Sequence, residues 1–178
     1  MDLVLQATTT LIYAGKLLAS SSHAHKTGIG VFDAPPGVVL ARLKDYERRH
    51  EWDDLYDYGG VVESFGESMD VAYVAYKAAL AMFKRRDLLV FRGWHRSPLD
   101  GSIVFVARSV ERESHPISDT HVRMEVLAPT GFLLTPIDDG NRTVMAGIGS
   151  LRLNGEESAL AWRVPRHGHG GRGGLGWV

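Results

Sequence analysis

The chain has 178 residues, of which 44% are hydrophobic and 23% charged, and its formal net charge at pH 7 is −1. A chain of this length can bury roughly 70% of its unfolded surface, which predicts one domain with a solid core. Lys and Arg are scattered among Asp and Glu, so no broad electrostatic attraction to nucleic acid or acidic membranes is expected. The absence of cysteine excludes disulfides, thiolate zinc sites and a cysteine nucleophile, and it suits the cytosol.

The N-terminal segment is mildly apolar but does not indicate a signal peptide or a membrane helix. Asp2 stands where a signal peptide carries a basic residue, and Lys16 interrupts the apolar run within residues 1–22. The run is also too short to cross a bilayer. Leu11 and Tyr13 follow a run of β-branched threonines, which predicts a first strand at this place instead.

A polar loop over residues 20–26 and a short strand over residues 28–32 are expected next. A helix follows, because Pro35 and Pro36 suit a first turn and apolar residues then recur at helical spacing. Its basic far end, residues 48–50, suits the negative end of the helix dipole.

The middle of the chain indicates a series of strands. After a loop over residues 51–60, strands are predicted near residues 61–66, 70–77, 87–95, 102–111, 121–128, 131–137 and 142–152. The turn signals between them are mostly short, which favours antiparallel neighbours over crossover helices. Residues 78–86 are ambiguous, since their composition also suits a helix.

The segments 86–94 and 102–111 have the pattern of one long hairpin with apolar residues on both faces. A strand that is apolar on one face needs a core on one side only. This pair needs cover on both sides, so something apolar must fill the second side.

The C-terminal segment differs in composition from the rest. Residues 156–163 predict a short amphipathic helix that ends before Pro165, and residues 167–177 are rich in Gly, His and Arg, which is typical of disorder. We therefore expect a domain over residues 1–153, followed by a short helix and a disordered tail over residues 154–178.

Five blocks occur in the order in which a known family carries them. They are His50-Glu51-Trp52-Asp53, Arg86-Asp87, Arg92 with Trp94, Arg108-Ser109-Val110-Glu111, and a strand pair over residues 122–127 and 131–137. Together they resemble the START (steroidogenic acute regulatory protein-related lipid-transfer) domain family over about residues 28–137. This START-like resemblance implies an α+β helix-grip fold, in which a curved antiparallel β-sheet surrounds a hydrophobic cavity and a long C-terminal helix closes it.

The START-like pattern of this chain is shorter at both ends than the pattern of the family. The helical segment that usually precedes the first strand is not expected here. The C-terminal lid helix is expected to be missing or shortened, because a helix over residues 156–163 spans about 15 Å at most.

The resemblance implies lipid binding without catalysis, as intracellular transfer or sensing of a phospholipid, sterol or sphingolipid through a hydrophobic tunnel. It further implies transient membrane contact, no nucleic-acid partner and no cofactor. A cytoplasmic location is expected, with or without peripheral association with membranes. The histidine pairs at positions 23 and 25 and at positions 167 and 169 have no third ligand at metal spacing nearby, so no metal site is predicted.

Arg92 is the first candidate for lipid contact, because it shares a strand face with Trp94 and a buried guanidinium needs a partner. That partner is a lipid phosphate or hydroxyl, or else a carboxylate such as Glu111 or Glu125. In sterol-binding members of the family an upstream acid pairs with this arginine. Tyr73 stands at the comparable place here, which argues against a sterol ligand.

The other candidates for lipid contact are aromatic or long side chains on the predicted strands. They are Tyr73, Tyr76, Trp94, Phe105, Arg108, Met124 and Phe132. The apolar ones serve equally well as ordinary core, and a long cation such as Arg108 more often extends to solvent. Trp52 and Asp53 are expected to fix the loop after the helix and not to bind ligand.

Two other functions stay open at this point. An enzyme of the same fold, such as a polyketide cyclase, an aromatase or a hydrolase, would use Tyr73, His95 or Arg92 for acid and base chemistry. No nucleophile motif or paired-carboxylate constellation marks such an enzyme. A truncated chain that has lost its ligand would instead act as an interaction module.

Overall fold

The described residues of the computed structural model are 7–17, 23–78, 84–128 and 130–154, and they contain ten strands, one α-helix and one 3-10 helix. In the first part of the chain these are β1 (Ala7–Leu17), β2 (His23–Phe32), α1 (Pro36–Lys44), the 3-10 helix η1 (Arg49–Glu51), β3 (Tyr56–Ser64) and β4 (Met69–Tyr76). They continue with β5 (Arg85–Arg96), β6 (Ile103–Ser109), β7 (His121–Arg123), β8 (Glu125–Val126), β9 (Gly131–Ile137) and β10 (Arg142–Arg152).

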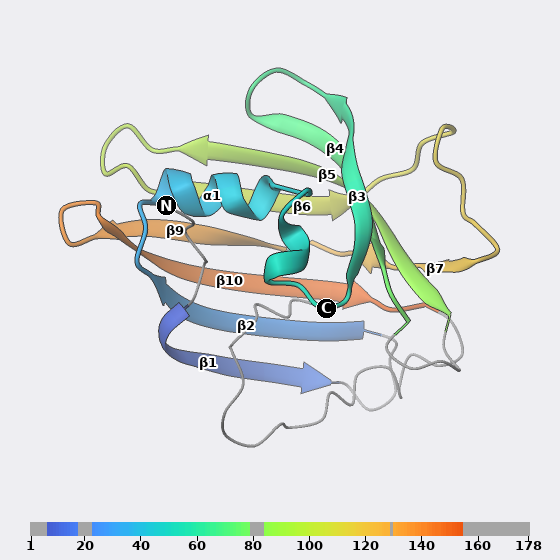
Figure 1. Ribbon diagram of the computed structural model, residues 1–178, viewed down its shortest axis with the longest axis horizontal. Helices are drawn as coiled ribbons and strands as arrows, with labels where there is room; N and C mark the ends of the chain where they lie inside the picture. Colours follow the sequence, from blue (N-terminus) through green and yellow to red (C-terminus); the bar gives the residue numbers. More distant parts are fainter. Residues whose placement is uncertain (1–6, 18–22, 79–83, 129, 155–178) are drawn as a thin grey trace.

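The strands form one sheet in the order β1-β2-β10-β9-β6-β5-β4-β3, with the short β7 and β8 paired to β5 and β10. Neighbours along this order are antiparallel. The sheet curves so strongly that β3 crosses in front of the central strands, on the side where α1 lies (Figure 1). This is the α+β helix-grip fold predicted from the sequence. The shortened lid helix and the tail expected beyond residue 154 lie outside the described residues.

The predicted hairpin of β5 and β6 is confirmed, with Trp94 directly opposite Phe105. Side chains of β5 alternate between two faces, and β5 is buried on both from Asp87 to Val90. We call the face that packs against α1 the inner face, and the opposite one the outer face. The inner face carries the cavity described below.

One strand departs from the predicted antiparallel order. The long loop between β6 and β7 returns the chain to the start of β5, where β7 pairs in parallel and His121 lies opposite Arg85. This pairing places Arg85 in a strand, within the segment 78–86 that also suited a helix, while residues 79–83 lie outside the described part of the chain.

Two predicted loops are partly strand. β2 begins at His23, inside the expected polar loop, because its ladder with β10 continues until His23 lies opposite Arg152. β3 begins at Tyr56, inside the loop expected over residues 51–60. Gly59 permits this, because a Cβ at that position would lie 2.6 Å from a backbone carbonyl oxygen of β4. Pairing with distant strands therefore overrides local composition at both places.

Helix α1 is predicted correctly at its start and is shorter than expected at its end. Pro36 occupies the first turn, and no side chain caps the N-terminus. The helix ends at Lys44, so the basic residues 48–50 lie in the following turn and in η1. Neither helix in the described part of the chain is long and apolar enough to cross a membrane.

Two hydrophobic clusters form the core. The first joins α1 to β2, β6, β9 and β10, and contains Phe32, Ala34, Val39, Leu40, Trp52, Ile103, Phe105, Leu134 and Met145. The second lies between β3, β4, β5 and the β7–β8 region, and contains Tyr56, Ala72, Val74, Tyr76, Leu88, Val90, Met124, Val126 and Leu153.

Candidate functional site

A cavity of about 180 Å³ lies between the two clusters, with walls drawn from both. Most of its wall is apolar and comes from the inner face of the sheet. The main apolar residues are Val74, Leu88, Val90, Phe105, Phe132 and Met145. Five of the polar side chains come from one side, where the segment after α1 meets the strands β4 and β5: Tyr46, Arg49, Trp52, Tyr76 and Arg92. Thr130, next to β9, is the sixth.

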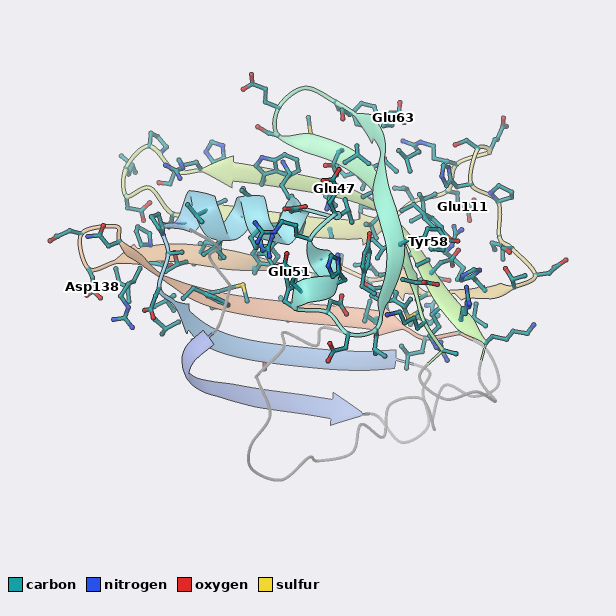
Figure 2. All side chains as sticks on the ribbon, in the orientation of Figure 1. Glu47, Glu51, Tyr58, Glu63, Glu111 and Asp138 are labelled. Carbon is teal, nitrogen blue, oxygen red and sulfur yellow. The ribbon has the colours of Figure 1, made fainter. Side chains whose placement is uncertain are left out.

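Arg92 is held by an ion pair inside the protein. It lies directly opposite Asp70 in the β4–β5 ladder. Its Nε donates to Asp70 Oδ1 at 2.6 Å and its Nη2 donates to Asp70 Oδ2 at 2.7 Å. The two side chains are 6% and 5% exposed. Of the two expected partners, Glu125 pairs with Arg152, and Glu111 is exposed in the β6–β7 loop (Figure 2).

The carboxylate that pairs with Arg92 is therefore Asp70, which is not among the partners expected from the sequence. Tyr73 lies opposite Leu89 and not opposite Arg92.

Arg49 forms a second buried polar centre on the same side of the cavity. Its Nε donates to Asp53 Oδ2 at 3.0 Å, and its Nη2 donates to the Tyr76 hydroxyl at 3.0 Å. The guanidinium also lies over the rings of Trp52, Tyr56 and Tyr76, at 5.0, 5.5 and 5.7 Å from their centroids. Burial raises the pKa of Tyr76 to about 12, so its phenol is neutral at ordinary pH.

Two buried donors on this side have no hydrogen-bond partner among the described residues. They are the Tyr46 hydroxyl and the Trp52 indole N–H. Burial raises the pKa of Tyr46, which keeps this hydroxyl protonated and able to donate. A buried donor without an acceptor is costly, so both atoms lower the stability of this part of the fold.

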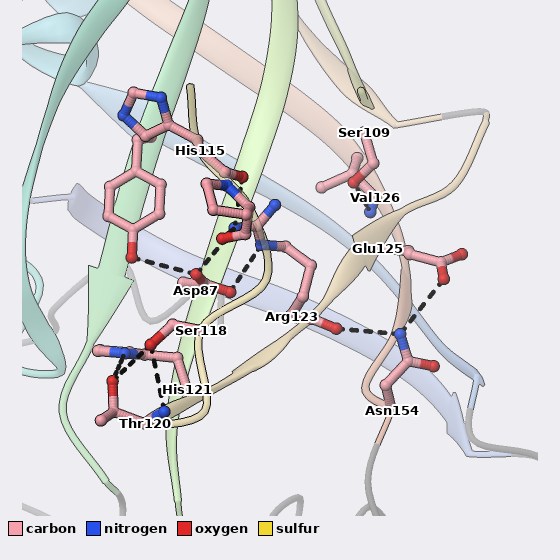
Figure 3. A network of polar contacts seen from close by, with 12 residues as sticks. Asp87, Ser109, His115, Ser118, Thr120, His121, Arg123, Glu125, Val126 and Asn154 are labelled. Carbon is pink, nitrogen blue, oxygen red and sulfur yellow. Dashed lines mark hydrogen bonds and ion pairs between the residues drawn. The ribbon is translucent and has the colours of Figure 1, made fainter. Parts of the chain in front are cut away.

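Tyr73 belongs to a different polar network, on the outer face. Its hydroxyl donates to Asp87 at 3.1 Å, and Arg123 donates to the same carboxylate at 2.8 and 3.1 Å (Figure 3). Arg123 also reaches the backbone carbonyls of His115 and Pro116. Asp87 is 1% exposed. The network thus ties the β6–β7 loop to the sheet and does not reach the cavity.

The outer face also carries an open apolar groove of about 600 Å³ over β6, β9 and β10. Val104, Val106, Leu133 and Ile148 line it and are 39–51% exposed. Arg108 borders this groove. The groove has no buried polar anchor comparable to those of the cavity, so the cavity is the stronger candidate for a specific small-molecule site.

The structure places the predicted lipid contacts in three groups. Four line the cavity: Arg92, Tyr76, Phe105 and Phe132. Two stand behind the wall: Met124 is fully buried in the second cluster, and Trp94 packs on the first cluster below the ammonium of Lys44. The other two, Tyr73 and Arg108, lie on the outer face, which corrects their expected place in the cavity wall. Lipid contact by the other six stays a prediction.

The residues proposed for an enzyme do not converge. Tyr73 and the exposed His95 occupy outward positions of their strands, whereas Arg92 occupies an inward one. Sequence reasoning missed Asp70, Tyr46, Arg49 and the unpaired indole N–H of Trp52 as parts of the site. No helical spacing signals Tyr46, Arg49 and Trp52, because α1 ends at Lys44 and these residues follow it in a turn and around η1.

Comparisons with known proteins agree with this architecture. A family model described as the START domain matches residues 3–151, and no curated protein sequence matches. Among solved structures, the human StarD13 (DLC2) lipid transfer and protein localization domain is similar with a TM-score of 0.71 and 24% identity, over 88% of this chain and 77% of that one.

Two further human structures share the fold at lower identity. Human STARD10 has a TM-score of 0.64 and 17% identity, over 83% of this chain and 62% of that one. Human StAR-related lipid transfer protein 5 has a TM-score of 0.62 and 19% identity, over 74% of this chain and 62% of that one. The chain thus spans about three fifths of these two structures. With a family match over most of its length, the chain belongs to the START domain family.

Proposed function

We propose that this domain binds a lipid in the cavity between its two hydrophobic clusters and transfers or senses it without catalysing a reaction. The observation that carries the proposal is the cavity itself, which has mostly apolar walls and a few polar side chains, most of them on the side of η1, β4 and β5. Such a cavity fits a ligand with an apolar body and a small polar head. Membership of a family named for lipid transfer, and structural neighbours with lipid transfer in their names, support the same conclusion.

The binding residues follow from the walls. Phe105 and Phe132 contact the apolar part of the lipid, and Tyr76 and Arg92 contact the part next to its polar head. Trp94 and Met124 pack behind these residues and keep their positions. Transfer requires transient contact with a membrane, and we propose a cytoplasmic location for the protein.

The size of the cavity sets a condition on binding. Small-molecule sites usually measure about 300–1,000 Å³, whereas this cavity measures about 180 Å³. The head and the adjoining part of the lipid therefore occupy the space between the described walls, and a longer ligand requires the walls to move apart or extends beyond them.

Native mass spectrometry of the full chain purified from cells tests the proposal directly, together with extraction of lipid from vesicles. We expect one lipid to co-purify and to be exchanged into vesicles. Consistent absence of lipid from the purified protein, with no extraction from vesicles, would overturn the proposal.

A matched pair of variants on β6 localises the binding to the cavity. Ala107 faces the cavity, whereas Val106 is its neighbour on the outer face and is 51% exposed. Ala107→Leu adds volume inside the cavity and should reduce the amount of bound lipid, because a close-packed wall has little space to yield. Val106→Leu makes a smaller change on the outer face and should bind lipid as the unaltered protein does.

A further inference from the structure

The outer face of the sheet carries an exposed apolar band. Its large hydrophobic side chains are 39–51% exposed and come from the four neighbouring strands β2, β10, β9 and β6: Ile29, Ile148, Leu133, Val104 and Val106. The strand register sets the band in two adjacent rows: Ile29, Ala146, Leu133 and Val104, then Ile148, Gly131 and Val106. Because side chains alternate between the faces of a strand, all of these side chains point away from the cavity.

The apolar band continues over β5 and β4. A Cβ added to Gly93 would lie 3.7 Å from Met69 and 3.8 Å from Val106, so the two side chains flank one glycine. Met69 is 44% exposed, and Phe65 lies beside Phe91 with 6.0 Å between the ring centroids. The band thus crosses six neighbouring strands, about 24 Å at 4.8 Å per strand. Soluble monomers rarely expose wide contiguous apolar patches, and such patches mark interaction surfaces.

The two ends of the outer face carry opposite charges. Arg108 is exposed at one end, and among the described residues that line the outer groove it is the only charged one. The turns from β5 to β6 and from β9 to β10 lie at the opposite end (Figure 1). Asp100 and Asp139 are exposed in these turns. A face with an apolar centre and opposite charges at its ends is complementary to a copy of itself that is turned by 180°.

We propose that two copies of this chain associate through their outer faces, about a two-fold axis that crosses the strands between Val104 and Val106. In this contact each apolar band covers the other, as in sheets that pack face to face about 10 Å apart. Arg108 of each copy then faces the acidic turns of its partner. The inner face and its cavity stay outside the contact, so the proposal does not depend on lipid binding.

Sedimentation velocity of the full chain over about 1–200 μM tests the association, since interfaces of standard size bind with micromolar affinity or tighter. We expect an equilibrium between monomer and dimer. A monomer at every concentration, or an assembly larger than a dimer, would overturn the proposal.

A matched pair of substitutions tests the face. Val106→Asp places a charge in the apolar band of each copy and should raise the dimer dissociation constant at least about 100-fold. Val61→Asp makes the same change on β3, outside the band, at a residue that is 50% exposed instead of 51%, and should leave the constant unchanged. Urea unfolding of both variants checks that they fold. Equal effects of the two substitutions, or none from Val106→Asp, would refute the assigned face.

Two further variants test the two-fold arrangement. The chain has no cysteine, so Val104→Cys introduces a single thiol close to the axis, and a short bismaleimide should link two copies. Val61→Cys should not be linked. Arg108→Glu should weaken the dimer at least about threefold, because each dimer has two such charged contacts. A dimer that resists cross-linking at position 104, or one that Arg108→Glu does not weaken, would overturn this arrangement.

Discussion

The buried ion pair of Asp70 and Arg92 gives the sharpest test of the site's physics. Asp70→Asn keeps the size of the side chain but removes its charge, which leaves the Arg92 guanidinium buried without a counter-charge. Both side chains are about 95% buried, at 5% and 6% exposure. Breaking a buried pair from one side typically costs about 3–5 kcal/mol, a large part of the about 5–15 kcal/mol that stabilises a domain.

Urea unfolding followed by circular dichroism measures this loss as a lower midpoint at constant slope. For a domain of this size, about 3–5 kcal/mol corresponds to a fall of about 6–20 °C in Tm. The matched control is Asp57→Asn, because Asp57 pairs with Arg85 at 3.2 Å on the surface, where the arginine is 57% exposed. That variant should lose at most about 1 kcal/mol.

A double variant separates charge from shape. Asp70→Leu with Arg92→Met replaces both charges by apolar side chains and should recover most of the stability that Asp70→Asn loses, because no unpaired charge remains. The reasoning is refuted if Asp70→Asn costs no more than Asp57→Asn, since the pair would then be as well solvated as a surface pair. A double variant as unstable as the single one would show that the loss comes from shape and not from charge.

Three further predictions concern the frame of the site. Gly59→Ala should cost about 1–3 kcal/mol in urea unfolding, because its Cβ would lie 2.6 Å from a carbonyl oxygen of β4, whereas Gly60→Ala meets open space and should be nearly neutral; equal effects would contradict the close approach. Burial raises the pKa of Tyr76 from 10.0 to about 12, so the folded state holds this proton more tightly than the unfolded state does. Its contribution to the free energy of unfolding is therefore complete below about pH 10 and declines as the pH rises toward about 12. Tyr76→Phe should flatten that decline, and an equally steep decline would rule out the effect. Asp87→Asn removes the carboxylate charge that pairs with Arg123 and should lower the free energy of unfolding by about 3 kcal/mol. Hydrogen exchange in the loop before β7 should become faster, and unchanged exchange there would mean that the network does not hold the loop.

The hairpin and most other strands could be predicted because alternation and short turns are local signals. The faces of individual residues were less well predicted, although the strand period contains that information. Tyr73 and Tyr76 are three positions apart on one strand, as are Phe105 and Arg108, and such residues face opposite sides of a regular strand. Only one of each pair can line the cavity, and the structure selects Tyr76 and Phe105.

The partner of Arg92 could not be predicted because it depends on register. Whether Asp70 lies opposite Arg92 depends on where β4 ends and β5 begins. The sequence leaves residues 78–86, which lie between the two strands, ambiguous between helix and strand. A shift of one residue would turn every side chain of the strand to the other face. The unpaired donors of Tyr46 and Trp52 could not be predicted either, because a hydrogen bond that is not made leaves no pattern in a sequence. The sequence indicated only a packing role for Trp52.

The pairing of β2 with β10 has a consequence for how the chain folds as it leaves the ribosome. Phe32 lies opposite Thr143, and the α1 residues Val39 and Leu40 pack with Leu134 and Met145. The N-terminal hairpin and the helix therefore emerge well before the strands that cover them. Contacts so distant in sequence form slowly and leave apolar surface exposed during synthesis. β2 and α1 are thus made before β10 but stabilised only with it, so we expect a nascent chain arrested before β10 to bind chaperones.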